Sequence, residues 1–262
     1  MSIKMKIVGE EDQEESRIEI IKLSASSMKT FDQCPKKYYY NYIAREPRKE
    51  WAHFKLGNFC HKVLENFHNI HLKRPDIPLA KLMSMAFTEA RKDEEFQDMP
   101  EKMLVEAKEL IKDYLVFVSS NGMPNVKGVE KKFNIKITDD ILIRGFLDRV
   151  DLDEDGQYHI VDYKTTKNVQ YLDPFQLLIY GIWLKDQYKD IDRFKGSYVL
   201  LRHKSAPKPY EFNLEDLEEC KKKIIGFASK IRTCGEEDKW TPLPSRLCQW
   251  CDFMNICPTQ SW

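Results

Sequence analysis

This 262-residue sequence has no long apolar run and no net charge, because 42 acidic residues balance its 42 basic ones. A membrane-spanning helix needs about 20 consecutive apolar residues, so we expect no membrane segment. The first residues, MSIKMKIVGEEDQEES, lack the apolar stretch of a secretory signal, which predicts an intracellular, cytoplasmic protein. Nucleic-acid-binding proteins often carry a basic excess, so such a role must be argued here from particular residues.

Cysteine usage excludes another class of protein. An odd number of cysteines in a chain without an export signal argues against a disulfide framework. Three cysteines fall within ten residues near the end of the sequence, at the spacing of metal or cluster ligands. The seven cysteines are Cys34, Cys60, Cys220, Cys234, Cys248, Cys251 and Cys257.

The order of local patterns divides the chain into regions. Residues 1–22 are acidic and aperiodic, which predicts a flexible segment. Residues 23–120 show the apolar spacing of helices, with interruptions at Pro35 and Pro100. Residues 240–262 are rich in cysteine, proline and tryptophan and form an irregular tail.

Residues 125–235 combine strands with helices. A helix should follow Pro174, and a long amphipathic helix should cover residues 214–233. We therefore expect an α/β core with a helical N-terminal part and a Cys-rich tail, all within one domain over residues 23–262. The predicted strands are residues 128–137, 141–152, 157–166 and 196–203.

Two of these strands carry carboxylates and a lysine that should meet. Asp162 and Lys164 are two residues apart, so they share one face of a strand. The turn signal DEDG makes the two strands antiparallel neighbours and places Asp148 opposite Asp162. Paired carboxylates suit a divalent cation such as Mg²⁺ or Mn²⁺. An Asp–Lys pair is more often a weak surface ion pair, but apolar runs precede both aspartates here.

The segments GFLDRVD and IVDYKTTK resemble the active-site signature of the PD-(D/E)xK nuclease superfamily, in its RecB-like branch. This resemblance implies a restriction-endonuclease-like core, in which helices flank a small mixed sheet. It also implies a metal-dependent deoxyribonuclease. Asp148, Asp162 and the main-chain carbonyl of Tyr163 would bind the metal, and Lys164 would assist catalysis.

Three further matches extend the resemblance. The segment GNFCHKVLENF is similar to the family's G-x-x-x-H helix, which implies that His61 is a metal ligand. Gln176 and Tyr180 match a QxxxY motif and would lie near the scissile strand. Glu130 occupies a position that is often acidic in the family and would support the site. Taken alone, each residue has a plainer interpretation as an ordinary helix-face, core-rim or exposed side chain.

The cysteines resemble those of the iron–sulfur branch of the same superfamily, which includes CRISPR-associated spacer-acquisition nucleases and the AddB nuclease domain. That resemblance implies a [4Fe–4S] cluster that joins the tail to Cys34 and acts as a structural staple. Zn²⁺ at the same four thiolates remains an alternative. The four expected ligands are Cys34, Cys248, Cys251 and Cys257.

Two basic segments could contact DNA. The segment CPKKYYYNYIAREPRK interleaves lysines with tyrosines that would either stack on bases or pack in the core. Arg202, His203 and Lys204 form a second basic edge. The family's habits imply single-stranded DNA or strand ends as substrate.

The function implied by the resemblance is that of a hydrolase, a single-strand-preferring DNA exonuclease in recombination, repair or CRISPR adaptation. A protein partner such as a helicase or integrase is expected, because the sequence contains no GxxxxGK[ST] motif for an ATP-driven motor. The alternative is a DNA-end-binding adaptor subunit of a larger helicase–nuclease or integration complex, with little cleavage of its own.

Overall fold

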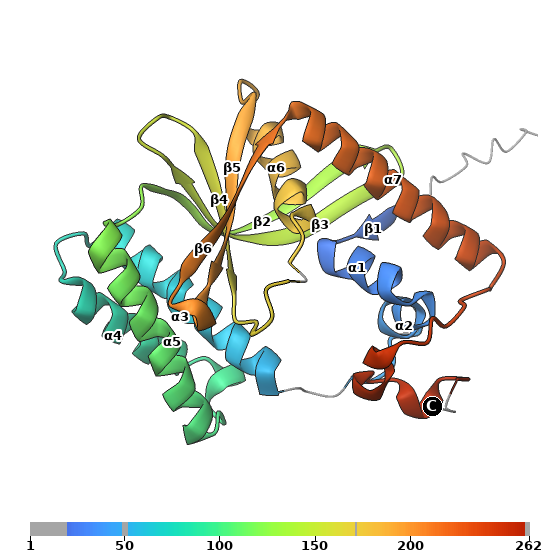
Figure 1. The fold of residues 1–262 in the computed structure, drawn as a ribbon, viewed down its shortest axis with the longest axis horizontal. Coiled ribbons are helices and arrows are strands. Elements are labelled where there is room, and N and C mark those ends of the chain that lie inside the picture. The colour runs from blue at the N-terminus through green and yellow to red at the C-terminus, as the bar shows by residue number, and fades with distance from the viewer. Residues whose placement is uncertain (1–19, 49–51, 171, 260–262) are drawn as a thin grey trace, which may run out of the picture.

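The computed structural model describes residues 20–48, 52–170 and 172–259, and it contains a mixed six-stranded sheet with helices on both faces (Figure 1). The strand order is β1-β3-β4-β5-β6, and β2 pairs with β3 as well. Pairing is parallel for β1 with β3 and for β4 with β5, and antiparallel elsewhere. The strands are β1 (Ile21–Leu23), β2 (Val126–Thr138), β3 (Ile141–Leu152), β4 (Tyr158–Lys164), β5 (Arg193–Leu200) and β6 (Ala206–Asn213).

The helices form two groups, one on each face of the sheet (Figure 1). Apolar side chains of α3, α4 and α5 pack on one face, and those of α1, α6 and α7 pack on the other. The α-helices are α1 (Ala25–Gln33), α2 (Pro35–Tyr38), α3 (Ala52–Lys73), α4 (Leu79–Ala90), α5 (Glu101–Asn121), α6 (Phe175–Gln187) and α7 (Leu214–Glu236). The π-helix is η1 (Tyr39–Ala44), and the 3₁₀ helices are η2 (Glu94–Phe96), η3 (Leu201–His203), η4 (Arg246–Trp250) and η5 (Met254–Ile256).

Local sequence explains where the N-terminal helices begin and end. Ser24 caps α1 by accepting a hydrogen bond from the Ser27 backbone N–H at 3.1 Å. Cys34 is extended, and Pro35 starts the next helix, where its missing N–H costs nothing. Pro100 precedes α5 in the same way. The predicted interruptions at both prolines are confirmed.

Strand β3 is paired along only part of one of its edges. β2 covers the other edge along almost its whole length. On the partly paired edge, β1 pairs with residues 141–143 and β4 pairs with residues 149–152. Within the described part of the chain, residues 144–148 therefore have no strand partner on that edge.

Two strands were not predicted. β6 contains Pro207 and Pro209, and it is tolerated because it pairs only with β5 at the edge of the sheet. β1 begins at Ile21, so the last two residues of the segment 1–22 expected to be flexible belong to a strand, and residues 1–19 lie outside the described residues. The fourth predicted strand, 196–203, ends three residues early because residues 201–203 form η3. Among the described helices, none has the length and apolar content needed to cross a membrane.

Candidate active site

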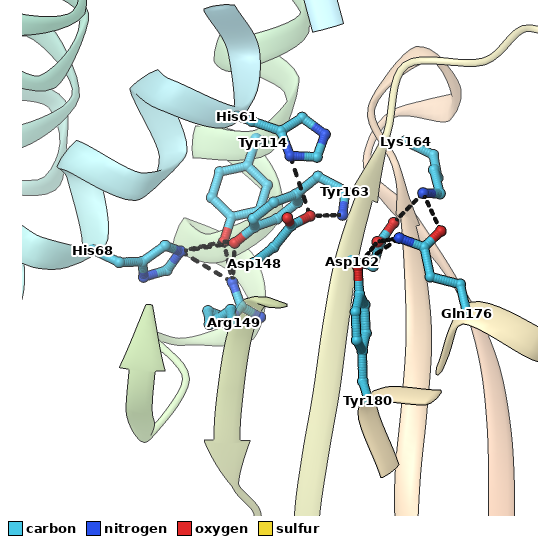
Figure 2. A network of polar contacts seen from close by, with 10 residues as sticks. All are labelled: His61, His68, Tyr114, Asp148, Arg149, Asp162, Tyr163, Lys164, Gln176 and Tyr180. Carbon is cyan, nitrogen blue, oxygen red and sulfur yellow. Dashed lines mark hydrogen bonds and ion pairs between the residues drawn. The ribbon is translucent and has the colours of Figure 1, made fainter. Parts of the chain in front are cut away.

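Asp148 and Asp162 face each other at the point where β3 and β4 separate. Each lies one residue beyond the last pair of the ladder, Arg149 and Val161. Both side chains are buried, with exposed fractions of 8% and 1%. The backbone N–H of Tyr163 donates a hydrogen bond to Asp148 Oδ2 at 2.8 Å (Figure 2). The hairpin thus brings the two carboxylates together as the sequence predicted.

His61 reaches this point from α3. Its Nδ1 lies 3.2 Å from Asp148 Oδ2. Gly57 stands one turn earlier, where an added Cβ would lie 3.2 Å from Thr165 Oγ1, so glycine lets α3 approach the end of β4 closely. Burial opposes a charged His61, but the Asp148 carboxylate outweighs it and raises the His61 pKa to about 9.

Glu130 completes a set of three potential ligands. It lies opposite Asp148 in β2, between the neighbouring pairs that Val129 and Lys131 form with β3. Its φ of 45° is in the left-handed region, which is strained for a residue with a side chain. Ligand atoms of His61, Glu130 and Asp148 all lie within 4.8 Å of one another. Burial, followed by the nearby Asp148 charge, raises the Glu130 pKa to about 7.

Asp162 stands beside Asp148 and contacts a different set of residues (Figure 2). Its Oδ2 forms an ion pair with Lys164 Nζ at 2.6 Å. Among the described residues this ammonium is its one close cation or donor, so the oxygen has acceptor capacity left for a ligand. Burial raises the pKa of Asp162, whereas that of Asp148 is lowered because His61 and the Tyr163 N–H outweigh its burial.

Gln176 and Tyr180 support Asp162 and Lys164 from α6. Gln176 Nε2 donates to Asp162 Oδ1 at 2.8 Å, and Gln176 Oε1 accepts from Lys164 Nζ at 3.0 Å. Tyr180 OH also donates to Asp162 Oδ1, at 3.5 Å. The two α6 residues therefore fix the orientation of the carboxylate and the ammonium.

A buried polar network beneath the site was not predicted (Figure 2). Arg149 forms an ion pair with Asp151 at 2.9 Å and donates to the hydroxyl groups of Tyr114 and Tyr163 at 2.6 Å each. His68 Nε2 lies 3.0 Å from the same guanidinium, and burial, followed by the Arg149 charge, lowers its pKa well below the usual value. The signal in the sequence was faint: Arg149 and Asp151 share one face of an otherwise apolar strand.

The four predicted cysteine ligands line one common pocket, which joins the tail to the junction of α1 and α2. Backbone N–H groups of Lys37 and Leu243 both donate to Cys34 Sγ at 3.4 Å. Tyr40 OH donates to the carbonyl of Ile256 at 2.9 Å and ties the tail down. In the described part of the chain, His61, Glu130 and Asp148 are the one set of three residues whose potential ligand atoms lie within 4.8 Å of one another. No three cysteine sulfurs are therefore that close together.

The two basic segments are occupied by internal contacts. In the first, Tyr38 stacks on Trp240 with ring centroids 5.8 Å apart, and Tyr40 packs against Phe253 at 5.2 Å. The alternative in which these rings pack in the core is therefore the one observed. In the second, Arg202 forms an ion pair with Glu106 and donates to the carbonyl of Thr165 at 2.7 Å.

The sequence of the chain is similar to those of a known protein family. A sequence profile of the PD-(D/E)XK nuclease superfamily matches residues 22–258. A subunit of the ATP-dependent helicase/deoxyribonuclease of Streptococcus pyogenes serotype M12 (strain MGAS2096) is 27% identical over 201 residues, which are 72% of this chain and 19% of that protein. The protein of the same name from serotype M1 gives the same values. The chain thus matches only a small part of these relatives.

One solved structure supports the fold. The crystal structure of a candidate exonuclease from Eubacterium rectale is 12% identical and has a TM-score of 0.53, over 98% of this chain and all of that one. At this identity the likeness concerns the fold alone. Together with the profile match, it confirms the predicted restriction-endonuclease-like arrangement of a mixed sheet flanked by helices.

Proposed function

The chain belongs to the PD-(D/E)XK nuclease superfamily, and from this premise we propose that it hydrolyses phosphodiester bonds in DNA with Mg²⁺ or Mn²⁺. The observation that carries the proposal is the trio of His61, Glu130 and Asp148 within 4.8 Å, next to the ion pair of Asp162 with Lys164. One imidazole and several carboxylates suit Mn²⁺ or Mg²⁺. This donor set fits the ion that the family uses.

The proposed ligands are His61, Glu130, Asp148, Asp162 and the main-chain carbonyl of Tyr163. A divalent ion bound there would polarise the phosphodiester and lower the pKa of water. Asp162 is prepared for this role because Gln176 of α6 holds one of its oxygens, while the other contacts only the Lys164 ammonium among the described residues.

Lys164 is the proposed catalytic cation. Its ammonium is held by the Gln176 amide oxygen and the Asp162 carboxylate, so it presents a fixed positive charge at the mouth of the site. Such a preorganised charge stabilises developing negative charge without reorganisation during the reaction. Gln176 and Tyr180 contribute by keeping this pair in place.

The proposed activity is that of a single-strand-preferring exonuclease in recombination, repair or CRISPR adaptation. The proposed nuclease domain covers residues 23–262. The relatives are named as subunits of a helicase/deoxyribonuclease, which supports a helicase as partner. An integrase is the alternative partner. The intracellular location stays a prediction.

We also propose that Cys34, Cys248, Cys251 and Cys257 hold a [4Fe–4S] cluster. All four cysteines line one pocket, and ligation by thiolates alone suits a [4Fe–4S] cluster. Zn²⁺ at the same four thiolates is the alternative. Iron and sulfide analysis of anaerobically purified protein should find four of each, and one zinc per chain with no iron would refute the proposal.

The test of the nuclease proposal is cleavage of end-labelled single-stranded DNA in Mg²⁺ or Mn²⁺. Asp162→Ala should lower the rate by at least about a thousandfold, given the magnitudes of active-site electrostatic contributions. Asp155→Ala is the matched control, because Asp155 is exposed and pairs only with Lys195 among described cations. Metal-dependent cleavage that survives in Asp162→Ala would refute the assignment, and DNA binding without cleavage in the parent protein would favour the adaptor alternative.

A further inference from the structure

A groove with a cavity volume of about 780 Å³ follows the unpaired edge of β3. Residues 144–146 of that edge line it, together with the start of α1, the start of α6 and the middle of α7. Lys164, Gln176 and Tyr180 line it as well. The groove therefore includes the proposed catalytic lysine in its wall.

The charge of the groove differs from that of the whole chain. Five cationic side chains line it, against two acidic ones, Asp32 and Asp173, although the sequence is neutral overall. The Asp173 carboxylate is held at the start of α6, since its Oδ1 accepts a hydrogen bond from the Phe175 backbone N–H at 2.9 Å. The five cations are Lys29, Lys132, Arg144, Lys164 and Lys223.

Three of these cations are free to bind an anion. Lys29, Lys132 and Arg144 are exposed, and none forms an ion pair or side-chain hydrogen bond with another described residue. Elsewhere in the described chain, many exposed lysines pair with a carboxylate three residues away on the same helix, as Lys222 does with Glu219 at 2.6 Å. Unpaired cations gathered along one groove are typical of a surface that binds phosphates.

Aromatic side chains lie among these cations. Phe146 is 57% exposed and is the cross-strand partner of Lys132. The Lys223 ammonium stands over the Phe175 ring, 4.5 Å from its centroid. An exposed ring beside a cation can stack on an unpaired base while the cation binds the adjacent phosphate.

We propose that this groove binds the single strand of DNA that is to be cut, with phosphates on Lys29, Lys132, Arg144 and Lys223 and a base stacked on Phe146. The inference rests on the proposed function, since the groove is lined by the proposed catalytic lysine. The volume lies in the range of pockets that enclose one drug-sized ligand, roughly 300–1,000 Å³. A volume of this size accommodates a few nucleotides of one strand.

Binding of a fluorescent single-stranded oligonucleotide, followed by anisotropy in EDTA, tests the groove without cleavage. Arg144→Ala/Lys223→Ala should weaken binding about tenfold and reduce the salt dependence by about two phosphate contacts. The control Lys136→Ala/Lys222→Ala removes the same charge from β2 and α7, outside the groove, and should bind like the parent. Equal binding by the two double variants would overturn the proposal.

Phe146 provides a second, uncharged test. Phe146→Ala should weaken binding at least about fivefold, the lower range of base–aromatic stacking, with no change in salt dependence. Phe146→Tyr keeps an aromatic ring at this position and should bind like the parent protein. Binding by Phe146→Ala that equals that of the parent protein would overturn the single-strand assignment. So would a parent protein that binds a blunt duplex as tightly as the single strand.

The two proposals can fail separately. A parent protein that binds the oligonucleotide through Arg144 and Lys223 but does not cut it in Mn²⁺ would refute the nuclease proposal and leave the groove intact. A protein that cuts DNA while its groove variants bind like the control would refute the groove alone. Thermal unfolding and cluster absorbance, measured on each variant, establish that loss of binding does not reflect loss of fold.

Discussion

Arg149→Met should destabilise the protein strongly, because Arg149 is the centre of a buried polar network. Arg149 is 6% exposed, and its guanidinium contacts Asp151, Tyr114, Tyr163 and His68. Methionine fills much of the same volume but removes every donor. Asp151, which is 3% exposed and already has one oxygen without a hydrogen-bond partner among the described residues, would be left as a buried charge without its cation.

Removing one partner of a buried ion pair costs about 3–5 kcal/mol. For a chain of this size each kcal/mol lowers Tm by about 2–4 °C, so the expected loss is roughly 6–20 °C. Differential scanning fluorimetry on the cluster-loaded protein measures it. Arg144→Met makes the same chemical change on the same strand, at an exposed arginine without an ion pair to a described residue, and should change stability by no more than about 0.5 kcal/mol.

The physical reason is tested by a second substitution. If the cost comes from an uncompensated Asp151, then Asp151→Leu added to Arg149→Met should recover part of the lost Tm, because replacing both members of a buried pair by apolar groups is often neutral. A double variant less stable than Arg149→Met would refute this reasoning. So would an Arg149→Met protein that melts with the parent.

Three further predictions concern the site and its supports. Glu130→Gln should raise the Mn²⁺ dissociation constant by at least about 10- to 100-fold, measured by calorimetric titration, and an unchanged constant would remove Glu130 from the ligand set. Gly57→Ala should lower the cleavage rate by moving α3 away from Thr165, whose Oγ1 would lie 3.2 Å from the new Cβ. Thr165→Ala added to Gly57→Ala should restore the rate. A double variant in which the two losses add would contradict this cause. Cys34→Ala should lower the iron content and Tm, while Cys220→Ala, at a buried cysteine on α7, should leave iron content unchanged.

The opposed carboxylates could be predicted because everything that places them is local. Strand periodicity sets the faces, and the DEDG turn sets the register, so Asp148 and Asp162 meet within one hairpin. Glu130 was assigned only a supporting position, because its left-handed backbone leaves no trace in residue type.

Elements that depend on distant partners could not be predicted from the sequence. β6 carries two prolines and has the pattern of a loop until β5 provides an edge to pair with. The tyrosine-rich segment after Cys34 has a composition that suits both base stacking and core packing, and the deciding contact is Trp240 at the far end of the chain. Burial of Arg149 likewise requires Tyr114 from α5 and His68 from α3.

Helix α1 links the two proposed sites of this protein physically. Its exposed Lys29 lines the groove, and its C-terminal cap is Cys34, which shares a pocket with the three cysteines of the tail. A cluster that fixes Cys34 therefore also fixes one wall of the groove, whereas His61, Glu130 and Asp148 are held by α3 and the sheet. Loss of the proposed cluster should consequently weaken binding of the oligonucleotide more than it weakens binding of Mn²⁺ at the proposed metal site.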